Sequence, residues 1–179
     1  INADSASGLS INGSTITLGG GTTLGFTNAS GTVTIASTLA GSGALSKAGA
    51  SGTLVLTSAS NEANMSGGIT VTEGSLQISN DDYLSSGTLT LNGGTLTNNS
   101  TAYTLDNAIS IGASGGTINV GGGGGATQMS ISGVISGSGT LVKNGQAILQ
   151  LDGNNTFTGS MSITAGTVIA GPANAFGTT

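Results

Sequence analysis

Residues 149–168 read L-Q-L-D-G-N-N-T-F-T-G-S-M-S-I-T-A-G-T-V, and this stretch decides the fold. Apolar and polar residues alternate in two short triplets, 149–151 and 161–163, and residues rich in glycine and asparagine separate them. Alternation with a period of two places both apolar side chains of a triplet on one face of a strand. Glycine and asparagine supply the conformations that tight turns need. The stretch therefore predicts short strands joined by turns.

The same triplet recurs along the whole chain of 179 residues. Further examples occupy residues 16–18, 33–35, 54–56, 69–71, 76–78, 89–91, 109–111, 118–120 and 129–131. No stretch has helical periodicity, so the predicted class is all-β. Each strand offers only two apolar side chains, and a core forms only if many such strands stack in successive turns. Turns of roughly 20 to 30 residues predict about seven turns of a right-handed, single-stranded parallel β-helix that spans residues 1–179. Leu89 and Leu91 should point inward, with Thr90 outside.

The composition excludes several classes of function. Cys, His and Arg are absent, the only basic residues are Lys47 and Lys143, and the formal net charge is -5. A Ser-His or Cys-His nucleophile pair and a zinc site of the usual type therefore cannot form. A nucleic-acid backbone finds no basic surface, and no apolar run approaches the ~18 residues of a membrane span. We expect no metal and no cofactor.

The sequence also contains a longer repeat, each copy of which includes several of these strands. The stretch 41–47 reads G-S-G-A-L-S-K, and 137–143 reads G-S-G-T-L-V-K, 96 residues later. The apolar triplets on either side also correspond, with short gaps. We therefore predict two repeat copies, at approximately residues 33–96 and 129–179, in which Lys47 and Lys143 occupy the same position.

The second copy resembles the autotransporter-associated β-strand repeat. Its run from Gly137 to Val168 follows that family's pattern, and Asn155-Thr156-Phe157-Thr158-Gly159 lies on the family's N-T-Y-T-G core, with Phe in place of Tyr. In the first copy, residues 64–67 keep only the apolar residue and the glycine of this core. The residues that carry the motif, and for which we expect structural roles, are Lys47, Lys143, Asn155, Phe157 and Gly159.

The resemblance implies a passenger segment of a type V secreted bacterial surface protein, located outside the outer membrane. Such passengers are long right-handed β-helices that serve as adhesin stalks or adhesive surfaces, so a non-catalytic role is expected. The implied partner is a host or neighbouring-cell surface protein or glycan. Because the second copy stops inside a repeat, we expect a fragment of a longer array. Unpaired strand edges at its ends predict self-association.

The alternative function is a carbohydrate-active β-helix enzyme, either a polysaccharide lyase or a hydrolase. Its support is fold analogy and the acidic pair Asp81-Asp82, since paired carboxylates serve glycosidases and hard-cation sites. Without arginine, a solvated turn is the simpler interpretation of that pair.

Three other features have structural interpretations. Strict alternation points both lysines inward, where the ammonium can bond turn carbonyls or an acidic neighbour; the alternative is a recurrent cation that binds a ligand. The glycine run 121–125 has no phosphate-loop sequence after it and is predicted to be a wide turn. Threonine pairs such as Thr70 and Thr72 recur at irregular intervals, and strand propensity explains them.

Overall fold

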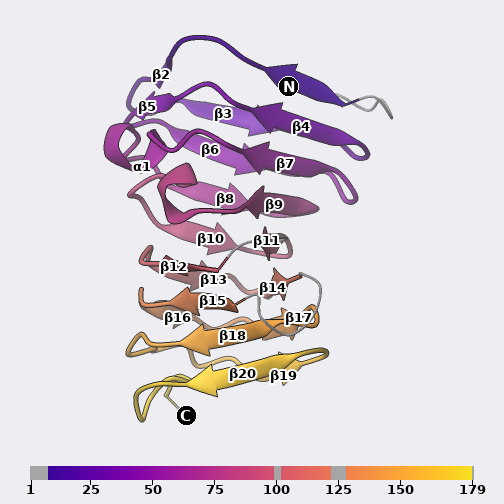
Figure 1. Cartoon of the computed structure of the whole chain (residues 1–179), viewed down its shortest axis with the longest axis vertical. Helices are drawn as coiled ribbons and strands as arrows, with labels where there is room; N and C mark the ends of the chain where they lie inside the picture. Colours follow the sequence, from indigo (N-terminus) through magenta and orange to yellow (C-terminus); the bar gives the residue numbers. More distant parts are fainter. Residues whose placement is uncertain (1–7, 99–101, 122–127, 179) are drawn as a thin grey trace.

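The chain forms a parallel β-solenoid of about seven turns (Figure 1). The computed structural model describes residues 8–98, 102–121 and 128–178. Every strand pair within these ranges is parallel, and partner residues on successive turns lie 19 to 26 positions apart in the sequence. The predicted all-β class and parallel stacking are therefore confirmed. None of the described helices is long and apolar enough to cross a membrane.

Three faces run along the solenoid axis. The first is an eight-stranded sheet made of β1 (Leu9–Ile11), β4 (Thr32–Ile35), β7 (Thr53–Leu56), β9 (Ser75–Ile78), β11 (Thr95–Asn98), β14 (Gly116–Val120), β17 (Leu141–Asn144) and β19 (Met161–Ile163). The second is a six-stranded sheet made of β3 (Thr23–Phe26), β6 (Ala44–Lys47), β8 (Ile69–Val71), β10 (Leu89–Leu91), β13 (Ile109–Ile111) and β16 (Ile135–Gly137).

The third face is interrupted by short helices. It begins with β2 (Ile16–Leu18) and β5 (Leu39–Gly41) and ends with β12 (Tyr103–Leu105), β15 (Gln128–Ile131), β18 (Ile148–Leu151) and β20 (Thr167–Ala170). Between them lie the one-turn helix α1 (Asn61–Asn64) and the 3₁₀ helix η1 (Asp81–Tyr83). Helix α1 contacts both β5 and η1, and η1 contacts β12. The absence of helical periodicity left both helices unpredicted, because each has a single turn.

The core consists of apolar columns inside the three faces. In the eight-stranded sheet, register stacks Val33, Leu54, Leu76, Leu96 and Ile118 on successive turns, and all five are buried. Stacking gives each short strand, with its two inward side chains, a core that it could not form alone.

The predicted facing of β10 is confirmed, because Leu89 and Leu91 are buried and Thr90 is partly exposed. Ile163 is the second apolar residue of the triplet 161–163, which alternation predicts to face the core, but it is 52% exposed. Its strand β19 ends the eight-stranded sheet within the part of the chain that the structure describes, so no further described strand of this sheet covers it. Of the glycine run, residues 122–125 lie outside the described residues.

Truncating one inward side chain should destabilise the solenoid. We expect Leu91→Ala to lower the free energy of unfolding by about 2–5 kcal/mol, because Leu91 is fully buried and the neighbouring turns cannot collapse into the cavity. Thr90→Ala, one position away on the outer surface, should cost about 0.5 kcal/mol or less. Urea denaturation measures both, and equal losses would show that the facing of β10 is wrong.

Candidate functional site

Both lysines lie inside the wall of the solenoid. Register stacks Lys47 between Phe26 and Val71, and it stacks Lys143 between Ile118 and Ile163. Both lysine side chains are fully buried. Burial lowers the pKa of both ammonium groups, and at Lys47 the charge of Glu73 partly opposes this shift. The stems thus extend the apolar columns, as a long aliphatic side chain can do.

Turn carbonyls surround each ammonium group. Lys143 Nζ donates to Asn144 O at 2.7 Å, to Gly145 O at 2.7 Å and to Ala165 O at 3.1 Å. Lys47 Nζ donates to the carbonyls of residues 28, 48, 49 and 73 at 2.5 to 3.5 Å. These carbonyls belong to successive turns, so each lysine ties turns together. An ammonium that is buried and bonded in this way has no donor left to offer a ligand outside the wall.

A buried asparagine forms a second tie between turns. Asn155 Oδ1 accepts a hydrogen bond from Ile135 N on the preceding turn at 2.8 Å. Its Nδ2 donates to Ala175 O on the following turn at 2.6 Å. One side chain therefore satisfies a backbone donor and a backbone acceptor, both of which would otherwise be buried without partners.

The first copy has the same asparagine tie, which the sequence pattern did not reveal. Asn61 Oδ1 accepts from Leu39 N and Asn61 Nδ2 donates to Tyr83 O, each at 2.8 Å. Three residues separate Asn155 from Gly159, whereas five separate Asn61 from Gly67. The two extra residues fall in the segment that contains the four-residue helix α1, and they hide the match. A search for Asn-x(3–5)-Gly in place of a fixed spacing would have found it.

Phe157 and Gly159 complete the motif. Phe157 is buried, and its counterpart in the first copy, Met65, is buried as well. A Cβ atom at Gly159 would lie 2.0 Å from Gly139 O, and one at Gly67 would lie 1.8 Å from Gly43 O. Successive turns thus approach too closely at this corner for any side chain. All five motif residues expected to be structural lie inside the wall or at its corners.

Comparison with known proteins identifies these motifs. Residues 45–78 and 141–170 match the family described as the passenger-associated-transport-repeat. The chain carries autotransporter passenger repeats. It is also similar to a protein named adhesin BmaC autotransporter, from Brucella suis biovar 1 (strain 1330), with 37% identity over 174 residues. The alignment covers 94% of this chain and 5% of that relative. No solved structure matches the chain.

The two passenger repeats are rotated about the solenoid axis relative to each other. Lys47 lies in β6 of the six-stranded sheet, whereas Lys143 lies in β17 of the eight-stranded sheet. The other corresponding strands show the same shift, since β4 matches β15 and β9 matches β20, each on the next face. The copies are therefore separated by four turns and one face. Equivalent residues do not line up on one side of the molecule.

Asp81, one residue of the acidic pair Asp81-Asp82, belongs to a larger acidic group. Ligand oxygens of Glu62 in α1, Asp81 in η1 and Asp106 after β12 lie within 4.8 Å of one another. Asp81 Oδ1 also accepts a hydrogen bond from Asp106 N at 3.4 Å. Burial raises the pKa of Asp81 to about 6, and the charge of Asp106 acts in the same direction. Three carboxylates could ligate a hard cation, which would relieve the repulsion between their negative charges. A proton on Asp81 relieves this repulsion as well.

Replacing Asp81 should change how stability depends on pH. The pKa of Asp81 is about 6 in the folded chain and 3.8 ordinarily, so folding favours the protonated carboxyl. Protonated Asp81 therefore contributes its full stability below about pH 4, and this contribution is lost as the pH rises through 6. Asp81→Asn should therefore stabilise the chain at pH 7, by at most about 1 kcal/mol because the site is partly solvated. It should have little effect at pH 4. Thermal unfolding at both pH values measures the difference, and a stabilisation that is equal at both would contradict the assignment.

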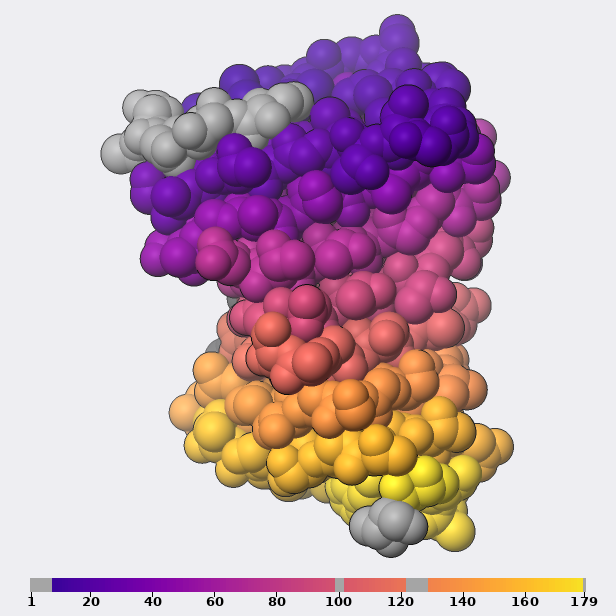
Figure 2. Space-filling model, turned by 180° about the vertical axis from the view of Figure 1, so that it is seen from behind, coloured from indigo at the N-terminus to yellow at the C-terminus, as the bar shows by residue number. Residues whose placement is uncertain are grey.

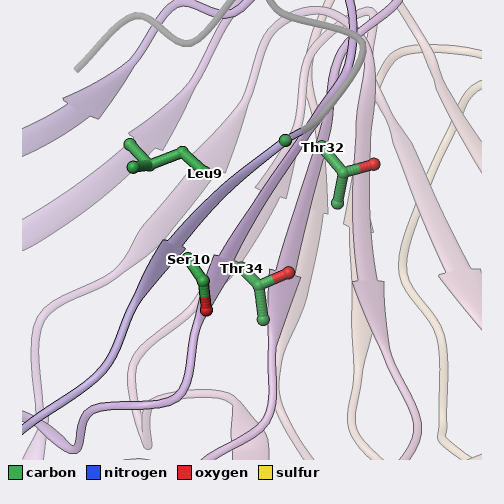
Figure 3. A pocket seen from close by; sticks show the side chains of 5 residues that line it. Leu9, Ser10, Thr32 and Thr34 are labelled. Atoms are coloured by element: carbon green, nitrogen blue, oxygen red, sulfur yellow. The ribbon is translucent and has the colours of Figure 1, made fainter.

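An open hollow lies on the outer side of the eight-stranded sheet (Figure 3). Its volume is about 250 Å³, and it is lined by Gly8, Leu9, Ser10, Thr32 and Thr34. Ser10 and Thr34 are register partners on adjacent strands. The hydroxyl of Ser10 donates to Asn12 Oδ1 at 3.0 Å. The lining carries no charge, so the hollow suits a small neutral, hydroxylated group.

Proposed function

We propose that the chain is a non-catalytic passenger segment, secreted or displayed on the outside of a bacterial cell, that acts as an adhesive surface or as part of an adhesin stalk. The observation that carries the proposal is the placement of the passenger-repeat residues. Lys47, Lys143, Asn155, Phe157 and Gly159 hold turns together from within. The repeat therefore builds a rod and leaves the outer surface free to vary.

The similar protein supports the adhesive part of this proposal, since it is named an adhesin. The chain spans 5% of that protein's length, so its partners and activity are carried over here as proposals only. The partner we propose is a surface protein or glycan of a host cell or a neighbouring bacterium.

A bead assay tests the adhesive role. Beads coated with the purified chain should bind cultured host cells or bacteria more than beads coated with the same chain after thermal unfolding. Equal binding of the two bead types would contradict the adhesive role and leave the stalk role. Turnover of pectin, alginate or a host glycan that Asp81→Asn abolishes would contradict the non-catalytic role and favour the carbohydrate-active alternative.

Another copy of the chain is a second proposed partner. Among the described residues, β19 and β20 have one neighbouring strand each, and Ile163 in β19 and Ile169 in β20 are 52% and 41% exposed. Unpaired parallel edges with apolar side chains favour pairing with another chain. We expect this 179-residue chain to associate as its concentration rises in sedimentation velocity. A single monomeric species at all concentrations would contradict this prediction.

A further inference from the structure

A ladder of hydroxyl groups runs along the outside of the eight-stranded sheet. Strand register aligns Thr32, Thr53, Ser75, Thr95 and Thr117 on five successive turns. Neighbouring parallel strands lie about 4.8 Å apart, so the five hydroxyls span about 19 Å. Turn lengths that vary from one turn to the next hide this regularity in the sequence, where threonines recur at uneven intervals.

The ladder hydroxyls are available for binding. All five residues are partly or fully exposed. Within the described part of the chain, no side-chain hydrogen bond engages any of the five. Both lysines, by contrast, are buried and bonded to carbonyls. The outer side of the eight-stranded sheet therefore offers a straight row of neutral donors and acceptors. The six-stranded sheet carries a similar row at Ser46, Thr70, Thr90 and Ser110, so the hollow beside Thr32 is what distinguishes the two faces.

The hollow of Figure 3 lies at the start of this ladder. Gly8 precedes Leu9, the partner of Val33, and therefore lies beside Thr32 on the next turn. A Cβ atom at Gly8 would lie 2.9 Å from Thr32 O. At this end of the row, a space of about 250 Å³ lies next to Gly8, Thr32 and Thr34. That volume is below the ~300–1,000 Å³ of pockets for drug-sized ligands, and it suits a single ring at the end of a longer chain.

Charge selects among the candidate ligands. The chain has a formal net charge of -5, and its two basic residues are buried. Glu73, at the corner before β9, accepts a hydrogen bond from Gly49 N and adds negative charge near the ladder. An anionic polymer is repelled by this surface, and a cationic ligand would be drawn to the carboxylates of α1 and η1. A neutral polymer rich in hydroxyls fits best.

We infer that the outer side of the eight-stranded sheet, from the hollow at Gly8 and Thr32 to Thr117, binds an extended neutral polysaccharide along the solenoid axis. Successive sugar units exchange hydrogen bonds with successive ladder hydroxyls, and a terminal ring occupies the hollow. This inference deepens the proposed adhesive function and rests on it. Figure 2 shows the molecule from behind, with its turns as stacked layers. The strands of the six-stranded sheet pair in parallel on successive turns, so its outer positions supply a matched control.

Retention on insoluble polysaccharides tests the inference. The purified chain is mixed with microcrystalline cellulose, an insoluble β-1,3-glucan and immobilised mannan, and the protein left in solution is measured. At least one of these neutral polymers should retain the chain, and retention should persist in high salt. Immobilised heparin and alginate should retain none. Failure of all three neutral polymers, or retention by the anionic polymers alone, would overturn the inference.

Two double variants locate the site. Thr32→Val with Thr53→Val removes two ladder hydroxyls and keeps β-branched side chains that favour strands. It should weaken retention at least fivefold. Thr70→Val with Thr90→Val makes the same change at two stacked positions of the six-stranded sheet and should alter retention less than twofold. Equal losses in the two variants would overturn the assignment to this face, and circular dichroism confirms that each remains folded.

Two further readouts distinguish polysaccharide binding from adhesion to a protein and from binding to ice. If coated beads adhere to cells but no neutral polysaccharide retains the chain, the inference fails and the proposed function stands. If neither occurs, the inference and the adhesive role both fail. A regular hydroxyl row could also match an ice surface, so thermal hysteresis that the Thr32→Val and Thr53→Val variant abolishes, without polysaccharide retention, would assign the face to ice and overturn the inference.

Discussion

A chain carrying Gly159→Ala is expected to unfold with a free energy at least about 4 kcal/mol lower than that of the unchanged chain. The added Cβ atom would lie 2.0 Å from Gly139 O and 2.5 Å from Gly139 C, well inside van der Waals contact. The neighbouring atoms are backbone, so they cannot move aside as the end of a flexible side chain could. The turn must shift instead, and that shift strains the inter-turn hydrogen bonds from Thr156 N to Ile135 O and from Thr158 N to Gly137 O.

Gly19→Ala is the matched control for this change. Gly19 lies outside the left-handed region, and a Cβ atom there would meet nothing within 4 Å. Its replacement should leave stability unchanged or raise it slightly, because alanine has fewer conformations in the unfolded chain. Urea denaturation compares both variants with the unchanged chain. A loss for Gly159→Ala no greater than the effect of Gly19→Ala would show that the turns are less closely stacked at this corner than we describe.

Local pattern was enough to predict the fold class. Leu89-Thr90-Leu91 alternates with a period of two, and such strands can form a core only by stacking. The repeat around Lys143 indicated that the stacked units were related. Neither inference needed knowledge of which turn lies above which, because alternation determines the facing of a side chain within its own strand.

The arrangement around the axis was beyond the sequence pattern. To place Lys47 and Lys143 on different faces, one must know how many strand positions lie between them. The helices α1 and η1 each take the place of a strand and have no alternating pattern, so the sequence alone gives the wrong number. The two extra residues between Asn61 and Gly67 also concealed the match between Asn61 and Asn155. The grouping of Glu62, Asp81 and Asp106 depends on three successive turns of the third face, and their sequence separations follow no fixed period because turn lengths vary.

Asn155→Ala should destabilise the solenoid strongly. Removing the amide leaves Ile135 N and Ala175 O buried without their side-chain partner, and both residues are fully buried. Each unsatisfied group costs about 1–3 kcal/mol, so we expect a total loss of about 4 kcal/mol. Asn61→Ala should cause a similar loss in the first copy, through Leu39 N and Tyr83 O.

Asn154, the neighbouring residue, provides a control for the general effect of removing an asparagine side chain. Asn154 is exposed, and Asn154→Ala should change stability by about 0.5 kcal/mol or less. If Asn155→Ala and Asn154→Ala unfold at the same urea concentration, the tie carries no stability. A large loss for Asn155→Ala with none for Asn61→Ala would mean that α1 supports its corner without the amide. Large and similar losses at both asparagines would show that the passenger repeat is defined by the residues that hold its turns together, on whichever face they lie.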